Sequence, residues 1–416
     1  MKTHPILLFL LQITIGFTWK FKQNPYADLS FEEKVAHDGY PLETYQIETK
    51  DNYLLALYRI PRGRLDPLER PPKRRRKQNR AKRRREPVLI LHGLGSAPAM
   101  YVLQGPGRAL AYNLVDSGFD VWLLSNRGCG RSDRHRFLDI DVDRKFWDFS
   151  FHEIAIYDLP PAVDFVANKT DRKLTLLGHS QGNTIMVIFL AEKPEYNDKV
   201  KLGVIYAPSV KIYLDMVLAT PVIYASELLT NISYLFGMYE VFPQSFVAPL
   251  RDLCKEQTYF LELCYHILSA IGSAPSKLLD LDLIPTIIGA ASGRASLLQL
   301  THYMQIIRTN YFGQFDHGPK KNMKIYGNST PPAYDLNKIS APMAVYYAPK
   351  DELATIQGAL DTIKLLPNVI HQELVDYEYF NHIDFLFAKN ATELVYVNTI
   401  NLIKSFDEKF ANNSIN

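Results

Sequence analysis

The sequence predicts an α/β fold, in which a mostly parallel sheet carries helices on both faces and an inserted helical cap interrupts the chain. In two stretches, short apolar runs that end in turn residues alternate with helical patterns, which is typical of strand–helix–strand units. Between these stretches the periodicity is helical and indicates no further strand. With 47% hydrophobic and 22% charged residues, the 416-residue chain can bury a large core.

Residues 19–209 predict the first part of the core. Because the strand–helix units follow one another in tandem, their strands are expected to lie parallel in one sheet. The third strand ends in a sharp turn. Strands are expected at 86–93, 119–128, 172–183 and 200–209, and helices at 105–118, 151–170 and 184–196.

Residues 210–320 predict the inserted helical cap, or lid. This stretch has long amphipathic patterns rich in Leu, Tyr and Ile, which prolines divide. Charged residues such as Glu227 and Asp280 break its apolar runs, which argues against a transmembrane helix. Residues 321–416 then predict the second part of the core, with strands in 341–354 and 368–375 and a final helix.

The N-terminus predicts a cleaved signal peptide over residues 1–18. Lys2 precedes an apolar run from Pro5 to Phe17, which is too short for a comfortable membrane span. The alternative is an N-terminal anchor. A signal peptide implies a secreted protein, with a lysosomal destination as the alternative.

Residues 62–86 form a basic run, with thirteen Lys and Arg residues against Asp66, Glu69 and Glu86. Since the whole chain has a formal net charge of only +3, the remainder is net negative, unlike a nucleic-acid-binding surface. We expect a disordered loop that leads into the strand at 86–93. Two sharper interpretations are a processing site at 80–83 and contact with polyanions or anionic surfaces through 73–85.

The cysteines and the glycosylation sequons fit the same secretory route. Cys254 and Cys264 could close a short disulfide loop and leave Cys129 unpaired, although two free buried thiols are the alternative. Asn-x-Ser/Thr sequons occur at Asn168, Asn231, Asn328, Asn390 and Asn412.

The motif Gly178-His179-Ser180-Gln181-Gly182 lies between a predicted strand and a predicted helix. In that context Gly-x-Ser-x-Gly predicts a tight, strained turn that exposes a nucleophilic serine, here Ser180. The bland alternative is a glycine-rich turn with an ordinary serine.

A serine nucleophile needs a histidine base and an acid that orients it, in the chain order Ser, Asp/Glu, His for this kind of turn. Asp351 and His382 each follow a later predicted strand, so both are expected at the edge where parallel strands end. Glu352 and Asp384 are rival acids. His371, inside the last strand, and His179, beside the serine, are rival bases.

Two backbone N–H groups should stabilise the negative oxygen of the transition state. We expect them from Leu94, in the turn after the strand at 86–93, and from Gln181, directly after the serine. His92 could be mistaken for a catalytic residue, but its ring is expected to make a hydrogen bond that shapes this turn.

Over roughly residues 25–408 the chain resembles the acid lipases of the gastric and lysosomal type, including their insect members. The motifs that carry the resemblance include "LHGLGS", "SNRGCGRSDRH", "LLGHSQGNT" and "YFNHIDFLFAKNA". The resemblance implies an α/β-hydrolase fold, a nucleophile at Ser180, an acid at Asp351, a base at His382 and oxyanion donors at Leu94 and Gln181. Where the family usually has an asparagine after "NRG", this chain has Cys129.

The resemblance also implies the substrates, which are neutral lipid esters: triacylglycerols and in some cases cholesteryl esters. We therefore expect a monomeric serine hydrolase that acts on lipid esters at an oil–water interface without a cofactor or metal. The alternative from another class is a non-catalytic lipid carrier on a hydrolase scaffold. A protein whose main function is polyanion binding through the basic run is a third possibility.

Overall fold

The computed structural model of the protein describes residues 29–65, 85–213, 220–241, 243–256, 262–266, 277–290 and 293–413. The predicted signal peptide and residues 66–84, which hold most of the basic run, lie outside the described residues. The expectations of a cleaved leader, a disordered loop and a processing site concern those residues and stay predictions.

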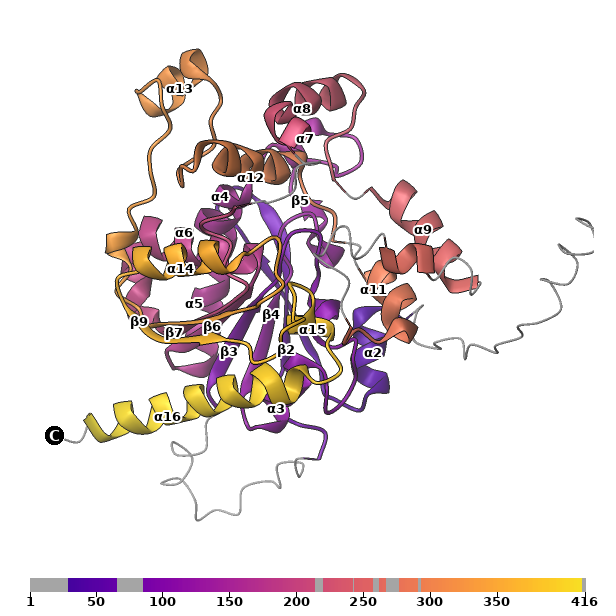
Figure 1. Ribbon diagram of the computed structural model, residues 1–416, viewed down its shortest axis with the longest axis vertical. Helices are drawn as coiled ribbons and strands as arrows, with labels where there is room; N and C mark the ends of the chain where they lie inside the picture. Colours follow the sequence, from indigo (N-terminus) through magenta and orange to yellow (C-terminus); the bar gives the residue numbers. More distant parts are fainter. Residues whose placement is uncertain are drawn as a thin grey trace, which may run out of the picture.

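A nine-stranded sheet forms the centre of the described chain (Figure 1). Its strand order is β1-β2-β4-β3-β6-β7-β8-β9, and the short β5 pairs with β2. From β4 to β9 all neighbouring strands are parallel, so the predicted α/β class with a mostly parallel sheet is confirmed. The strands are β1 Glu43–Glu48, β2 Tyr53–Ile60, β3 Pro87–Leu91, β4 Asp120–Leu124, β5 Arg134–His135, β6 Leu174–His179, β7 Val200–Tyr206, β8 Met343–Tyr347 and β9 Val369–Leu374.

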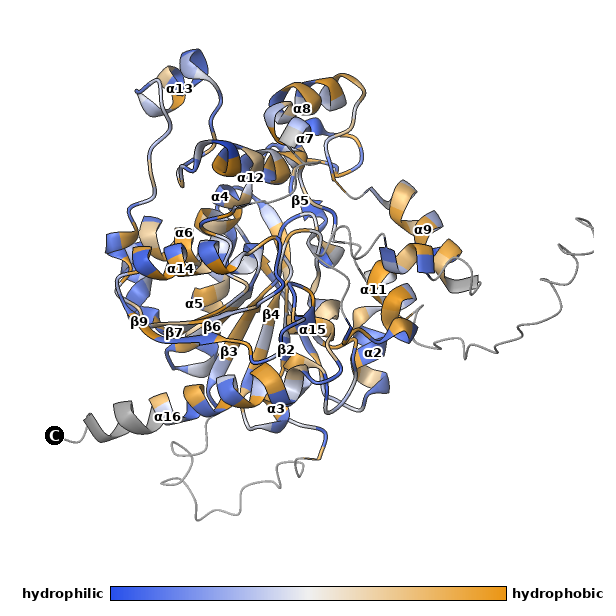
Figure 2. Ribbon diagram, in the orientation of Figure 1, coloured by the Kyte–Doolittle hydropathy of each residue, from blue (hydrophilic) through white to orange (hydrophobic). Residues whose placement is uncertain are grey.

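The central strands are buried on both faces, because alternate side chains of each strand enter two different hydrophobic clusters. In β3, Val88 and Ile90 belong to the cluster that includes α3 (Leu110–Asp116) and α16 (Val397–Asn413). Leu89 and Leu91 belong to the cluster with α5 (Leu159–Thr170) and α6 (Gln181–Glu192). The hydropathy colouring of Figure 2 shows this layering, with mainly hydrophobic central strands between helices that have one hydrophobic and one hydrophilic side.

The antiparallel edge of the sheet was not predicted from the sequence. β1 and β2 pair with each other and β2 pairs with β4, all antiparallel. This pairing places β4 inside the sheet, between β2 and β3, which agrees with the burial of all its residues. Two π-helical turns were also not predicted: Ile154–Asp158 before α5 and Thr392–Tyr396 before α16.

The chain between β7 and β8 is mainly helical in the part that the structure describes. In Figure 1, α7, α8 and α12 lie together beyond one end of the sheet and α13 projects beside them, whereas α9 and α11 lie at the side of the sheet. The last of these helices, α13, runs past the predicted boundary at residue 320. The helices are α7 Thr220–Tyr224, α8 Ser226–Leu235, α9 Gln244–Glu256, α11 Ile284–Ala290, α12 Leu297–Thr309 and α13 Pro319–Tyr326.

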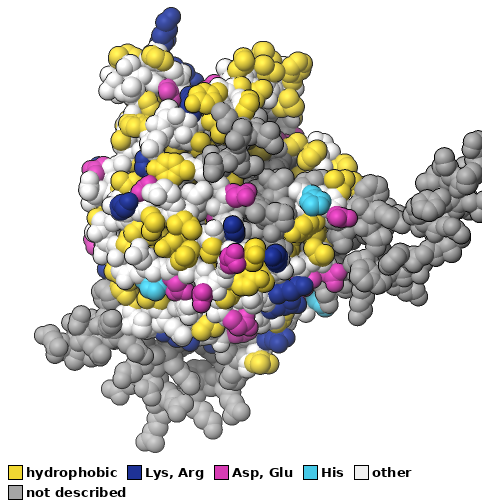
Figure 3. Space-filling model, in the orientation of Figure 1, with side chains coloured by type: hydrophobic (Ala, Val, Ile, Leu, Met, Phe, Trp, Pro, Cys, Tyr) yellow, Lys and Arg dark blue, Asp and Glu magenta, His cyan; other side chains and the backbone are white. Residues whose placement is uncertain are grey.

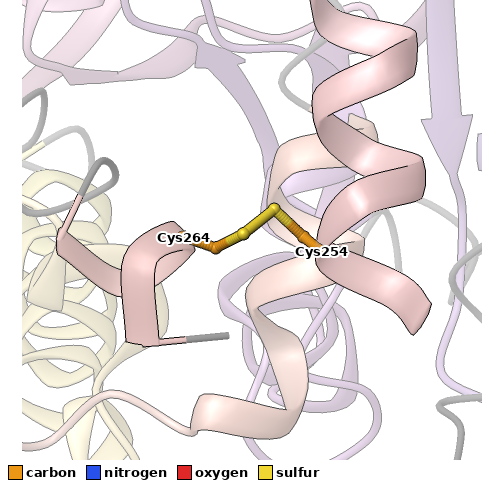
Figure 4. Close-up of a disulfide and its surroundings, with 2 residues drawn as sticks. All are labelled: Cys254 and Cys264. Carbon is orange, nitrogen blue, oxygen red and sulfur yellow. A yellow bond between two sulfur atoms is a disulfide. The ribbon is translucent and has the colours of Figure 1, made fainter. Parts of the chain in front are cut away.

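Cys254 at the end of α9 and Cys264 form a disulfide that closes a loop of ten positions, with a Cα–Cα distance of 6.0 Å (Figure 4). Cys129 is a buried free thiol. Among the described helices, none is long and apolar enough to cross a membrane.

Candidate active site

Ser180 lies in a tight turn between β6 and α6. Its φ of +53° is in the left-handed region, which a serine rarely adopts. The turn leaves no room for side chains beside it, because a Cβ on Gly182 would be 2.1 Å from the carbonyl oxygen of Leu91 and one on Gly178 2.6 Å from the backbone nitrogen of Asn183. The backbone N–H of Ser180 donates to the carbonyl of Tyr206 in β7 (3.0 Å), which fixes the turn to the sheet.

Asp351 and His382 meet at the same edge of the sheet. Asp351 follows β8 and His382 follows β9, and His382 Nδ1 lies 2.8 Å from Asp351 Oδ2. The other carboxylate oxygen, Oδ1, accepts hydrogen bonds from the backbone N–H groups of Leu353 (2.9 Å) and Ala354 (2.7 Å). The carboxylate is therefore held in one orientation and occupies Nδ1, which leaves Nε2 of His382 for other chemistry.

The surroundings of Asp351 favour its ionised form. Burial alone would raise the pKa of this carboxyl group, but the charge and hydrogen bond of His382, together with the two backbone donors, hold it below its usual value. An ionised Asp351 can stabilise a positive charge on His382 when that imidazole accepts a proton.

His179 links this pair to the serine turn. Its Nε2–H donates to the backbone carbonyl of His382 (2.9 Å), and the two imidazole rings lie 5.0 Å apart. Burial and the neighbouring His382 lower the pKa of His179 to about 3, so the ring is a neutral donor rather than a base. Since His179 is adjacent to Ser180 in the chain, this bond holds the His382 loop beside the serine.

The turn after β3 approaches the serine from the other side. A Cβ on Gly93 would lie 3.2 Å from Ser180 Cβ and 3.6 Å from its Oγ, so the backbone around Leu94 is next to the nucleophile position. Gln181 is the first residue of α6, where the helix provides no acceptor for the backbone N–H. Both predicted oxyanion donors therefore lie beside Ser180.

The rival residues have other surroundings. His92 is buried, and its Nε2 accepts from the backbone N–H of Asn126 while Nδ1 contacts the carbonyl of Gly93, as expected for a ring that shapes the turn. His371 Nε2 contacts Glu373 within β9. Asp384 is buried as the first residue of the short helix α15 (Asp384–Phe387), and its Oδ2 accepts from the backbone N–H of Asn381 (3.0 Å). Glu352 is exposed beside Asp351.

Comparison with known proteins identifies the family. The family model described as a partial alpha/beta-hydrolase lipase region matches residues 31–105, and the one for the alpha/beta hydrolase fold matches residues 86–252. "Lipase 1" of Drosophila melanogaster is 34% identical, over 88% of this chain and 78% of its own. The gastric triacylglycerol lipases of Bos taurus and Homo sapiens are 31% and 30% identical, over 93% and 97% of this chain and 94% and 98% of theirs. The chain is a member of the acid lipase family.

The lipase is thus a carboxylic ester hydrolase, and the resemblance found in its sequence is confirmed. A solved structure of a soluble variant of monoglyceride lipase from Saccharomyces cerevisiae matches with a TM-score of 0.52 at 14% identity, over 94% of this chain and 99% of that one. At that identity the likeness shows the α/β-hydrolase fold alone.

Within the described part of the lipase, no three His, Cys, Asp or Glu side chains are grouped so that they could hold a metal ion.

The role of His179 in this lipase site was not predicted from the sequence. From the sequence His179 was only a rival base, whereas in the structure it holds the backbone of the His382 loop. Its place next to Ser180 in the Gly-x-Ser-x-Gly motif gave no sign of this contact, because the loop that it reaches is 203 positions away.

Proposed function

We propose that this lipase hydrolyses neutral lipid esters through an acyl-enzyme on Ser180, with His382 as the base and Asp351 as the acid that orients it. Ser180 Oγ attacks the ester carbonyl carbon while His382 Nε2 takes the hydroxyl proton. The alcohol then leaves with that proton. Water then attacks the acyl carbon while His382 takes one of its protons. The bond between the acyl carbon and Ser180 Oγ breaks, the fatty acid leaves, and His382 returns the proton to Ser180 Oγ.

The observation that carries this proposal is the 2.8 Å contact between Asp351 and His382, held beside a strained serine turn by His179. The developing oxyanion would lie between the backbone N–H groups of Leu94 and Gln181. A preorganised donor of this kind contributes about 3 kcal/mol to the transition state.

Triacylglycerols are the proposed substrates, and cholesteryl esters the second candidates. Two relatives that align over almost the whole chain are named gastric triacylglycerol lipases. The helices between β7 and β8 are proposed to form the cap over the acyl chain, as water-excluding cover for an apolar substrate.

The orientation of α8 supports action at a lipid surface. This helix packs on α12 through hydroxyl groups, with Thr230 Oγ1 2.6 Å from Thr301 Oγ1. Its apolar side chains Leu228 and Leu235, and Phe236 directly after it, point to solvent instead. Figure 3 shows the hydrophobic side chains that gather at this end of the molecule. An exposed apolar surface of this kind fits an oil–water interface.

We further propose a product of the secretory pathway that is released from the cell or delivered to the lysosome. The disulfide between Cys254 and Cys264 fits an oxidising compartment. The sequon residues Asn168, Asn231 and Asn328 are exposed, as glycosylation requires, and Asn390 is half-buried. The side chain of Asn412 lies outside the described residues.

Replacement of the nucleophile tests the function. Ser180→Ala should reduce the turnover of a soluble p-nitrophenyl ester to a trace, roughly a 10⁵-fold or larger loss in kcat, because no other group can form the acyl-enzyme. Ser405→Ala, which removes an exposed hydroxyl on α16, is the matched control and should keep full activity.

A fluorophosphonate probe separates this proposal from a lipid carrier on the same fold. Only an activated serine should be labelled, so the wild type and Ser405→Ala should react and Ser180→Ala should not. An unlabelled wild type that binds triacylglycerol without cleaving it would favour the carrier.

A further inference from the structure

Two separate segments contact the turn that holds Leu94, and both do so at the carbonyl oxygen of Ser96. Within the turn, the backbone N–H of Ser96 donates to the carbonyl of Gly93 (3.3 Å). Gly293, which precedes α12, lies so close that a Cβ on it would be 2.0 Å from Ser96 O and 2.8 Å from the carbonyl carbon of Gly95. From the core, Cys129 Sγ donates a hydrogen bond to the same oxygen (3.4 Å).

Gly293 belongs to a segment that is firmly attached to the core. The neighbouring Arg294 forms an ion pair with Asp141 of the core (2.7 Å), and its guanidinium lies 5.1 Å from the centre of the Trp147 ring. A second ion pair, with Glu240 (2.6 Å), lies within the insertion itself. Ser296 Oγ donates to the carbonyl of Trp147 (2.6 Å). Residues 293–296 are therefore a fixed point at which the helical insertion touches the core.

Cys129 is equally well fixed. Its carbonyl accepts from Ser125 Oγ (2.8 Å), and its backbone N–H donates to the carbonyl of Asn126 (3.0 Å). Burial raises the pKa of this thiol to about 12, so it stays protonated and can act as a donor at physiological pH.

We infer that Gly293 and Cys129 are positioning residues for the oxyanion hole, since together they fix Ser96 and hence the direction of the Leu94 N–H group. The inference rests on the proposed function, in which Leu94 is an oxyanion donor. Electrostatic stabilisation of this kind depends on donors that are already in place, and a displacement of about 1 Å can reduce the rate roughly 100-fold.

The insertion thereby has a role beyond covering the substrate. The backbone at Gly293 contacts the turn that completes the oxyanion hole. The geometry of the oxyanion hole therefore depends on a residue more than 190 positions away from Leu94. Only glycine fits at position 293, because any side chain would overlap the Ser96 carbonyl.

Gly293→Ala tests the role directly. We expect kcat for a soluble ester to fall about tenfold or more while KM changes less than about twofold, because the loss is confined to the transition state. Affinity for a boronic acid, which mimics the tetrahedral intermediate on Ser180, should fall in the same proportion as kcat/KM. A purely structural defect would not link these quantities.

Gly313→Ala is the matched control, since a Cβ there would also meet a backbone oxygen, at 2.6 Å from Pro332 O, far from the oxyanion turn in the chain. It should lower the melting temperature but keep kcat and boronic acid affinity. Should Gly293→Ala not fold, Cys129→Ala supplies a gentler test: we expect about a threefold fall in kcat and in boronic acid affinity, which Cys129→Ser should partly restore.

Two results would overturn the inference. One is a Gly293→Ala protein that loses stability but keeps kcat and boronic acid affinity, as the Gly313 variant should. The other is Cys129→Ala with unchanged boronic acid affinity. A wild type that neither turns over esters nor reacts with fluorophosphonate would instead refute the proposed function.

Discussion

Each oxygen of the Asp351 carboxylate has its own partner: Oδ2 binds His382 and Oδ1 binds two backbone N–H groups. Asp351→Asn keeps the size of the side chain but removes the negative charge. An amide N–H group in place of Oδ2 would donate to His382 Nδ1, so Nε2 would carry the proton and could not act as the base. We expect kcat for a soluble ester at neutral pH to fall about 10³- to 10⁴-fold with little change in KM.

Asp384→Asn is the control for this substitution. The Asp384 carboxylate is also buried, and it accepts a hydrogen bond from the backbone N–H of Asn381, three residues earlier. It therefore fixes the backbone around His382 rather than the imidazole ring. We expect a lower melting temperature and less than about a tenfold loss in kcat. If the Asp384 variant lost more activity than the Asp351 variant, the acid would be wrongly assigned.

Helix α12 is attached to the core through a buried histidine. His302 stacks on Phe151 with ring centres 4.1 Å apart, its Nδ1 lies 3.2 Å from Ser150 Oγ, and its Nε2 lies 3.0 Å from the carbonyl of Gly313. Burial, with smaller contributions from His152 and His317, lowers the pKa of His302 to about 3. Below pH 6.5 the His302 imidazole therefore becomes protonated in the unfolded chain but stays neutral in the folded protein.

This difference predicts a stability that depends on pH. Above pH 6.5 the contribution of His302 is fully present, and it is lost as the pH falls toward 3, because only the unfolded state gains the proton. Between pH 6.5 and 5 the loss should be about 2 kcal/mol. Melting temperatures measured from pH 7 to pH 4 should fall less steeply for His302→Gln than for the wild type. Equal slopes in the two proteins would contradict the assignment.

The elements that could be predicted are those whose signal is local. The runs in β3 and β4 are buried on both faces, so every residue except Asp120 at the start of β4 is apolar, and turn residues mark their ends. β2 has a similar apolar run, "YLLALYRI", but Leu and Ala also favour helices, so the run by itself does not distinguish a strand from a helix segment. Its place in the sheet depends on antiparallel pairing with β1 and β4, which is set by tertiary contacts.

Across the whole molecule, the candidate catalytic residues could be predicted from the sequence, but the contacts that hold them in place could not. Ser180, Asp351 and His382 follow from motif, chain order and position at strand ends. The contacts of His179 with the His382 loop and of Gly293 with Ser96 join segments roughly 200 positions apart. No local pattern encodes such contacts, because they depend on how the loops and the helical insertion pack on the finished sheet.

The surface at the α8 end of the molecule predicts different behaviour toward dissolved and emulsified substrates. Leu235 and Phe236 are 85% and 76% exposed, and insertion of such side chains into a lipid phase contributes about 1.5–3 kcal/mol each. Leu235→Ser combined with Phe236→Ser should therefore reduce the hydrolysis rate of emulsified triacylglycerol at least tenfold, while kcat/KM for a soluble ester should stay within about twofold of the wild type.

A second pair of serine substitutions, at Leu365 on α14 (Ile356–Leu365) and Ile370 on β9, removes partly exposed apolar side chains elsewhere and should leave both rates unchanged. Equal losses on both substrates in the α8 variant would indicate damage to the site rather than to surface binding. Unchanged emulsion rates would show that this lipase contacts the oil–water interface through another face. The ratio of the two rates is thus the decisive quantity, because it cancels any general loss of active protein.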